Sequence, residues 1–219
     1  MITITPSEAV TLVRKNLDEQ EINASALYVS GSPDTTDNDS LDQIIKKTLP
    51  EAINAVHRDA DALLLEGVAG TPTGATINET VLTFSFTPAI LRLVAFQAVD
   101  SSVVLGEWIP EFSAEGRKQL NVYVRGTYDD PALVKVQGAQ TFRYYTLKAA
   151  TATTYASNPA SAVSRFIYIP EQTYSANAAS YSVATLLRDP AILHLTGMVL
   201  SIYGENDKAN YFFEKAKSL

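Results

Sequence analysis

The spacing of hydrophobic positions changes twice along the chain. From Leu41 to Ala60 apolar residues recur at i, i+3 and i+4, which predicts an amphipathic helix. From about Asn78 to Ile169 apolar and polar residues tend to alternate, which is typical of strands. After Pro170 the helical spacing returns. The pattern therefore predicts helices towards both ends of the chain and a β region between them.

Local signals place the individual helices. The run Thr5-Pro6-Ser7-Glu8 has the order of a capping box and predicts a helix from Pro6 to about Asp18. Pro50 lies inside the 41–60 helix and has no amide hydrogen, so we expect that helix to bend or break there. Three further helices are predicted over 178–188, over 190–203 and from Asn206 or Asp207 onward.

The β region contains several short candidate strands separated by turn residues such as Gly126 and Gly138. The candidates are 80–87, 91–99, 103–105 with 108–109, 120–128, 132–136, 141–148 and 165–169. We expect an antiparallel arrangement, because strands this close together leave no room for crossover helices. Residues 31–40 contain no hydrophobic side chain, and 67–78 is rich in glycine. Both segments are predicted to be loops that could become ordered on assembly.

These patterns predict an α+β protein. Residues 1–77 and 173–219 are expected to form one helical bundle, and residues 78–172 an inserted, antiparallel β-rich subdomain. A chain of 219 residues is long enough to bury a sizeable core.

Composition narrows the classes of function. The formal net charge of −7 disfavours a sequence-independent grip on a phosphate backbone. The absence of cysteine excludes disulfides, thiolate metal sites and a cysteine nucleophile. Residues 1–6 lack the basic region and apolar run of a signal peptide, and no apolar stretch approaches the roughly 18 residues of a membrane span. We therefore expect a soluble protein made in a cytoplasm, with no membrane partner.

Catalytic motifs are missing from the sequence. The segment Gly67-x-x-Gly70-x-x-x-Gly74 follows a helix and has no lysine to meet a phosphate. His57 is expected on the surface or near a helix end, and His194 in a helical core. The acidic cluster Asp34, Asp37, Asp39 and Asp42 lacks the spacing and the glycine of a calcium loop. We expect no enzyme activity, cofactor or metal, although a hydrolase using two carboxylates from separate strands would leave no sequence signature.

Aromatic residues are concentrated in the second half of the β region and just after it. Half-buried strands use such side chains for packing, but carbohydrate grooves and protein interfaces use them too. The aromatic positions are Trp108, Phe112, Tyr123, Tyr128, Phe142, Tyr144, Tyr145, Tyr155, Phe166, Tyr168, Tyr174 and Tyr181. The candidate residues for a subunit or partner interface are Trp108, Ile109, Phe112, Tyr123 and Tyr128.

Two segments resemble proteins of tailed bacteriophages. Leu49-Pro50-Glu51-Ala52-Ile53-Asn54-Ala55-Val56-His57-Arg58, followed by Leu63-Leu64-Leu65-Glu66-Gly67, is similar to the helical part of structural proteins of crAss-like phages. The segment from Leu186-Leu187-Arg188-Asp189-Pro190-Ala191-Ile192-Leu193 to Tyr203-Gly204-Glu205-Asn206-Asp207-Lys208-Ala209-Asn210-Tyr211-Phe212 resembles the end of head-to-tail connector proteins. The two blocks cover roughly 90 residues, and many connector proteins lack a β region as long as this one.

The resemblance implies a virion protein of the phage neck or tail. It would form a homomeric ring of twelve copies, as portals and their adaptors do, in contact with the portal protein and neighbouring ring proteins. Genomic DNA would pass through its lumen without specific contacts, and assembly would take place in the bacterial cytoplasm. The alternative is a β-rich carbohydrate- or peptide-binding module that uses its tyrosines as a platform.

Overall fold

The computed structural model describes residues 1–19, 41–87, 89–138 and 140–218. It confirms a mixed α+β protein. The chain divides into a helical unit, formed by Met1–Glu66 and Gln172–Leu219, and a β unit, formed by Gly67–Glu171. The predicted loop at 31–40, which holds all of the acidic cluster except Asp42, lies outside the described residues.

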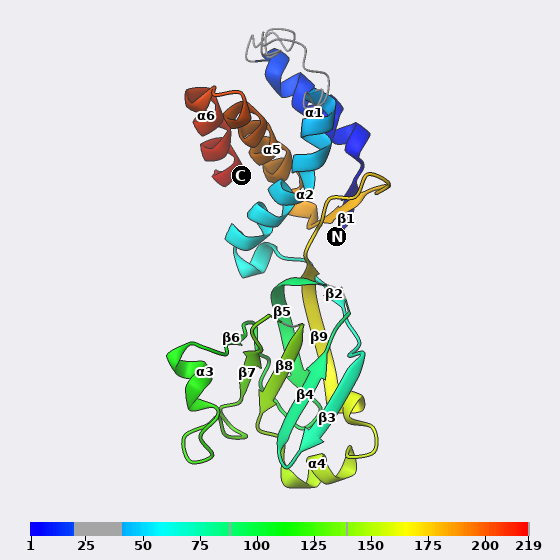
Figure 1. Ribbon diagram of the computed structural model, residues 1–219, viewed down its shortest axis with the longest axis vertical. Coiled ribbons are helices and arrows are strands. Elements are labelled where there is room, and N and C mark those ends of the chain that lie inside the picture. Colours follow the sequence, from blue (N-terminus) through cyan, green and yellow to red (C-terminus); the bar gives the residue numbers. More distant parts are fainter. Residues whose placement is uncertain (20–40, 88, 139, 219) are drawn as a thin grey trace. The chain divides into compact units, whose positions relative to one another are not determined.

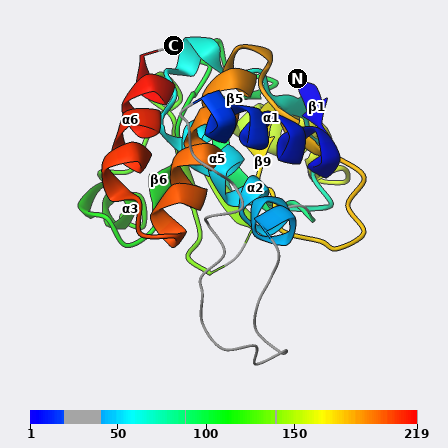
Figure 2. The same ribbon diagram turned by 90° about the horizontal axis from the view of Figure 1, so that it is seen from above.

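The helical unit is organised around α5 (Arg188–Ile202). This helix packs on α1 (Pro6–Glu19), α2 (Leu41–Asp59) and α6 (Asn206–Lys217), as Figures 1 and 2 show. Its sequence is apolar on nearly every side, and such a helix is stable in water only when other helices surround it. Most of its residues are buried, so the predicted central helix near 190–203 is confirmed.

The starts of these helices follow the sequence signals in part. The Glu8 amide donates a hydrogen bond to Thr5 Oγ1 at 3.1 Å, so the predicted cap of α1 is confirmed. The Glu8 carboxylate, however, accepts a hydrogen bond from Arg188 of α5. The α2 helix continues through Pro50, so the break that was one of the two expected outcomes does not occur. Pro50 is buried there.

The helix predicted over 178–188 is wrong. Strand β10 (Tyr181–Val183) instead pairs antiparallel with β1 (Ile2–Ile4), and a 3₁₀ helix (Thr185–Leu187) follows. Tyr181 and Val183 are buried in this arrangement. The partner strand lies almost at the other end of the chain, and aromatic and β-branched side chains favour strands once a partner is available.

The β unit contains two sheets. The three-stranded sheet has the order β2 (Val68–Ala69), β9 (Val163–Pro170), β5 (Ile90–Ala98). The five-stranded sheet has the order β3 (Gly74–Asn78), β4 (Val81–Ser85), β8 (Thr141–Tyr145), β7 (Ala132–Lys135), β6 (Ile109–Pro110). Two short helices, α3 (Ala114–Lys118) and α4 (Ala149–Thr154), and a 3₁₀ helix (Pro159–Ala162) complete the unit.

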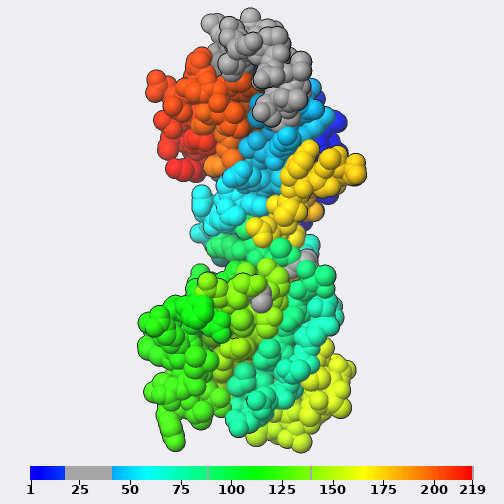
Figure 3. Space-filling view, in the orientation of Figure 1, coloured from blue at the N-terminus to red at the C-terminus, as the bar shows by residue number. Residues whose placement is uncertain are grey.

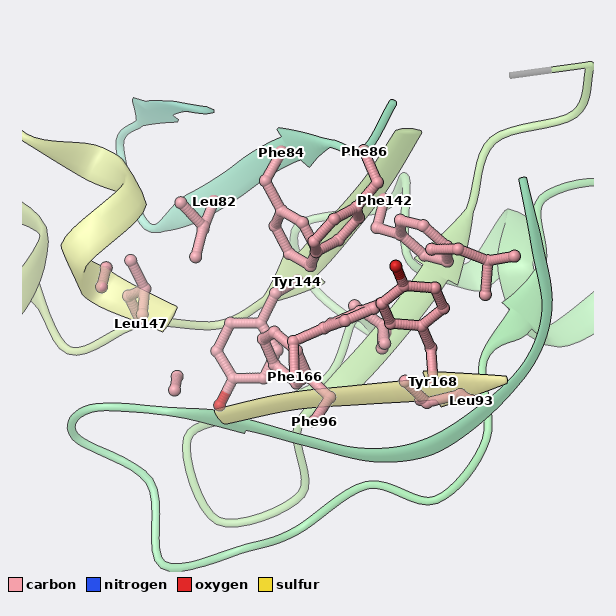
Figure 4. Close-up of a cluster of buried hydrophobic side chains, with 14 of the residues drawn as sticks. Leu82, Phe84, Phe86, Leu93, Phe96, Phe142, Tyr144, Leu147, Phe166 and Tyr168 are labelled. Carbon is pink, nitrogen blue, oxygen red and sulfur yellow. The ribbon is translucent and has the colours of Figure 1, made fainter. Parts of the chain in front are cut away.

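An aromatic cluster forms the core of the β unit (Figure 4). The ring of Phe84 stacks on Phe96, with centroids 5.4 Å apart, and on Phe142 at 5.7 Å. Phe86 stacks on Phe166 of β9 at 4.1 Å. Rings from both sheets thus interdigitate, and each buries on the order of 150–250 Å² of surface. The alternation that predicted strands also supplies this core.

One prediction about the β region is wrong, and two others hold only in part. Strands β2 and β3 lie within 67–78, where a loop was expected, because Ala75 and Ile77 turn one face of β3 towards the core. The expected antiparallel pairing is confirmed for the other described strand pairs of the unit, but strand β6 runs parallel to β7. The connection between them contains α3 and is long enough to return the chain in the same direction. Leu105 makes only an isolated bridge with Phe96 instead of belonging to a strand.

Candidate interaction surface

The short helix α3 is fixed against strand β6. The Ser113 hydroxyl donates to the Pro110 carbonyl oxygen at 2.8 Å and accepts from the Gly116 amide at 3.0 Å, so it caps the helix. A Cβ at Gly116 would lie 2.2 Å from Pro110 O and 2.6 Å from Glu111 O. Only glycine allows this close approach, and it sets the direction in which the chain leaves β6.

An apolar loop, residues 120–124, follows α3. The Leu120, Val122 and Val124 side chains are each more than half exposed, and Tyr123 is 95% exposed. Contiguous apolar surface of this kind is uncommon on monomeric proteins and marks sites of interaction. Figure 3 shows the green region that includes α3 at the outer margin of the β unit. The apolar loop is therefore the candidate interaction surface of this unit.

Local hydrogen bonds hold the apolar loop in place. The side-chain oxygen of Asn121 accepts from the Tyr123 amide at 3.0 Å, and its carbonyl oxygen accepts from the Val124 and Arg125 amides. The Gln119 side chain accepts from the Gly126 amide at 2.6 Å. These turns replace the strand predicted over 120–128, which is wrong. An asparagine that bonds its own neighbours offers the backbone an alternative to a strand ladder.

Basic side chains flank the apolar loop. The Arg117 guanidinium donates to the Phe112 carbonyl oxygen at 3.0 and 3.1 Å, and Arg125 donates to Thr80 Oγ1 at 3.2 Å. Lys118 pairs with Glu115 at 2.7 Å on the exposed face of α3. Residues 115–125 contain three basic side chains and one acidic, so the formal charge of this segment is opposite in sign to the net charge of the chain.

The structure separates the five interface candidates into two groups. Phe112 and Tyr123 are exposed on either side of α3 in the sequence. Trp108 and Ile109 are half-buried, and the Trp108 ring packs 5.6 Å from Phe142 in the core cluster, centroid to centroid. Tyr128 is also half-buried, because its hydroxyl donates to the Asp100 carbonyl oxygen and Lys148 Nζ lies 3.9 Å from its ring centroid.

Sequence reasoning missed Leu120, Val122 and Val124 as surface residues. Their alternation with Asn121 and Tyr123 has the period of a half-buried strand, and this period predicts the strand over 120–128. The asparagine within the run and the glycine after it were the available signs of a turn.

Half of the twelve aromatic residues that could have formed a binding platform are buried. Six of them are at most 8% exposed: Phe142, Tyr144, Tyr145, Phe166, Tyr168 and Tyr181. A buried ring cannot stack on a sugar or a peptide. The other six positions stay at least partly exposed, and Tyr123 and Tyr174 are the most exposed tyrosines among them.

The two histidines lie in the helical unit. His57 lies near the end of α2, one of its two expected positions, but it is fully buried and its Nε2 accepts a hydrogen bond from the Ala184 amide at 3.1 Å. Burial lowers the pKa of His57 from 6.5 to about 4. His194 is half-buried with its ring 4.9 Å from that of Phe213, and burial lowers its pKa as well.

The described ranges contain neither a metal-binding group nor a membrane-spanning helix. No three His, Asp or Glu side chains within them are grouped so that they could hold a metal ion. No helix in the part of the chain that the structure describes is long and apolar enough to cross a membrane. In comparisons with known proteins, no family model, curated protein or solved structure matches the chain.

Proposed function

We propose that this chain is a virion structural protein that forms a homomeric ring in the head-to-tail connector of a tailed bacteriophage. The ring links the portal to the tail, and genomic DNA passes through its lumen. The terminal helices form one connector bundle in this proposal, and the β-rich region is an insertion that reaches neighbouring subunits. The resemblance of segments 49–67 and 186–212 to phage structural proteins supports the assignment.

The apolar loop at 120–124 is the observation that carries the proposal. Its side chains stay exposed although hydrogen bonds hold the backbone in a defined conformation. A preorganised loop loses little conformational entropy on binding, so the burial of Tyr123 and its neighbours would contribute directly to association. Tyrosine is among the residues that dominate interface energetics.

The charge of the chain suits a passage for DNA. With 17 basic and 24 acidic side chains, a ring of this protein would be strongly acidic. An acidic lumen does not bind phosphates and would let the duplex slide, whereas a basic lumen would retain it.

Negative-stain electron microscopy of the purified protein at increasing concentration tests the proposal, together with light scattering to obtain the mass. We expect closed rings with a central hole wide enough for duplex DNA. The variant Val122→Ser/Tyr123→Ser should assemble only at a higher concentration than the native protein. Tyr174→Ser, at another exposed tyrosine, serves as the matched control and should assemble normally. A protein that stays monomeric at every concentration would contradict the proposed self-assembly.

A further inference from the structure

The helical unit carries a groove of about 500 Å³. Its wall combines the end of α2, the start of α5 and the end of α6, and is mainly apolar: Val56, Ala60, Leu64, Leu187, Pro190 and Ala216. The volume lies within the range of roughly 300–1,000 Å³ that is usual for binding pockets. It is sufficient to receive a large side chain.

Two exposed leucines are sequence neighbours of residues that line the groove. Leu63, next to the lining residue Leu64, is 92% exposed, and Leu186, next to Leu187, is also largely exposed. Such a surface is suited to a protein segment that carries several apolar side chains in a row.

Charge distinguishes the groove from the apolar loop of the β unit. Two acidic side chains and one basic side chain line the groove, namely Asp59, Asp61 and Lys217. Segment 115–125, which contains the apolar loop, has three basic side chains and one acidic, namely Arg117, Lys118, Arg125 and Glu115, and Asp129 and Asp130 follow it. Opposite signs at the two surfaces favour their encounter and disfavour contact between two copies of the same loop.

We propose that the apolar loop of one copy, residues 120–124, docks in the groove of the helical unit of the next copy. This inference rests on the ring proposed above and names the contact that builds it. A protruding apolar segment that fits a different surface of an identical molecule makes a heterologous contact, and such contacts form rings when the rotation closes. Tyr123 supplies the side chain that enters the groove, and Leu120, Val122 and Val124 cover its margin.

Cysteine crosslinking tests the contact, because the natural chain has no cysteine to interfere. Val124→Cys places a thiol on the loop and keeps Tyr123, and Ala60→Cys places one in the groove. With a short bismaleimide we expect a crosslinked dimer when the two variants are mixed, and none from either variant alone. A chain carrying both cysteines should give a ladder of multimers, since each copy contacts two neighbours. Val124→Cys mixed with Tyr174→Cys is the matched control and should not crosslink.

A second measurement reports on the groove itself. The Ala60→Cys thiol should react with a maleimide dye at least tenfold more slowly in the assembled protein than in the dilute monomer. Tyr123→Ser should raise the concentration needed for half-assembly at least tenfold, whereas Tyr123→Phe should stay close to the native value because the ring is retained.

The outcomes separate this inference from the proposed function. If rings form while the groove thiol stays reactive, or if they crosslink through Val124→Cys alone, the docking of the loop in the groove is wrong. The proposed ring would still hold. A crosslink that closes within one chain of the double variant would also overturn it. If no assembly occurs at any concentration, both proposals fail.

Discussion

Replacing His57 by glutamine should make the free energy of unfolding of the helical unit less dependent on pH in the acidic range. The imidazole is fully buried between α2 and the segment after β10, and its Nε2 accepts a hydrogen bond from the Ala184 amide. Protonation would place a charge in the core and remove this acceptor. The folded protein therefore resists protonation of His57 until the pH approaches 4.

The size of the effect follows from the two pKa values. His57 titrates near 6.5 in the unfolded chain and at about 4 in the folded protein. One pKa unit corresponds to about 1.4 kcal/mol, so the difference amounts to about 3 kcal/mol. The unfolded chain binds the proton first as the pH falls. The stabilising contribution is thus complete above pH 6.5 and is lost between pH 6.5 and 4.

Urea denaturation followed by circular dichroism at 222 nm measures this loss, because the long helices lie in the helical unit. Glutamine keeps a side-chain acceptor for the Ala184 amide but cannot titrate. Between pH 7 and pH 4 the free energy of unfolding of the native protein should fall by about 3 kcal/mol more than that of His57→Gln. His194 is present in both proteins and cancels in the comparison. Curves that run parallel over this range would refute the reasoning.

The remaining predictions concern the β unit. Phe84→Ala should lower its free energy of unfolding by about 3–5 kcal/mol, measured by the fluorescence of Trp108, because Phe84 is almost completely buried among other rings. The control Phe112→Ala removes an exposed ring and should change the value by less than about 0.5 kcal/mol. Gly116→Ala should destabilise the unit and weaken assembly, because its Cβ would clash with the Pro110 carbonyl. Gly74→Ala, where a Cβ meets no atom within 4 Å, should do neither, and equal effects would disprove the argument.

The local pattern of apolar residues was sufficient to predict the type and place of several long elements. The residues from Leu41 to Ala60 form α2, because their spacing places the apolar side chains on one face that must be buried. The run near 190–203 forms α5, because a helix that is apolar on nearly every side must be surrounded by others. The same holds for β4, where the buried Leu82 and Phe84 alternate with half-buried positions and belong to the core. These elements could be predicted because their information lies within a few turns or residues.

The period of apolar residues alone did not decide the candidate site or several other features: local turns decided the first, and residues distant in the sequence decided the others. Whether 120–124 became a strand or an exposed loop was decided by the turns at Asn121 and Gly126, and both outcomes have the same alternation. Likewise, Tyr181–Val183 became a strand because Ile2–Ile4 lies beside it, and His57 is buried because Ala184 packs against it. The sequence by itself determined which side chains must leave water. Only the tertiary structure decided which of them find partners within the chain and which remain exposed for another molecule.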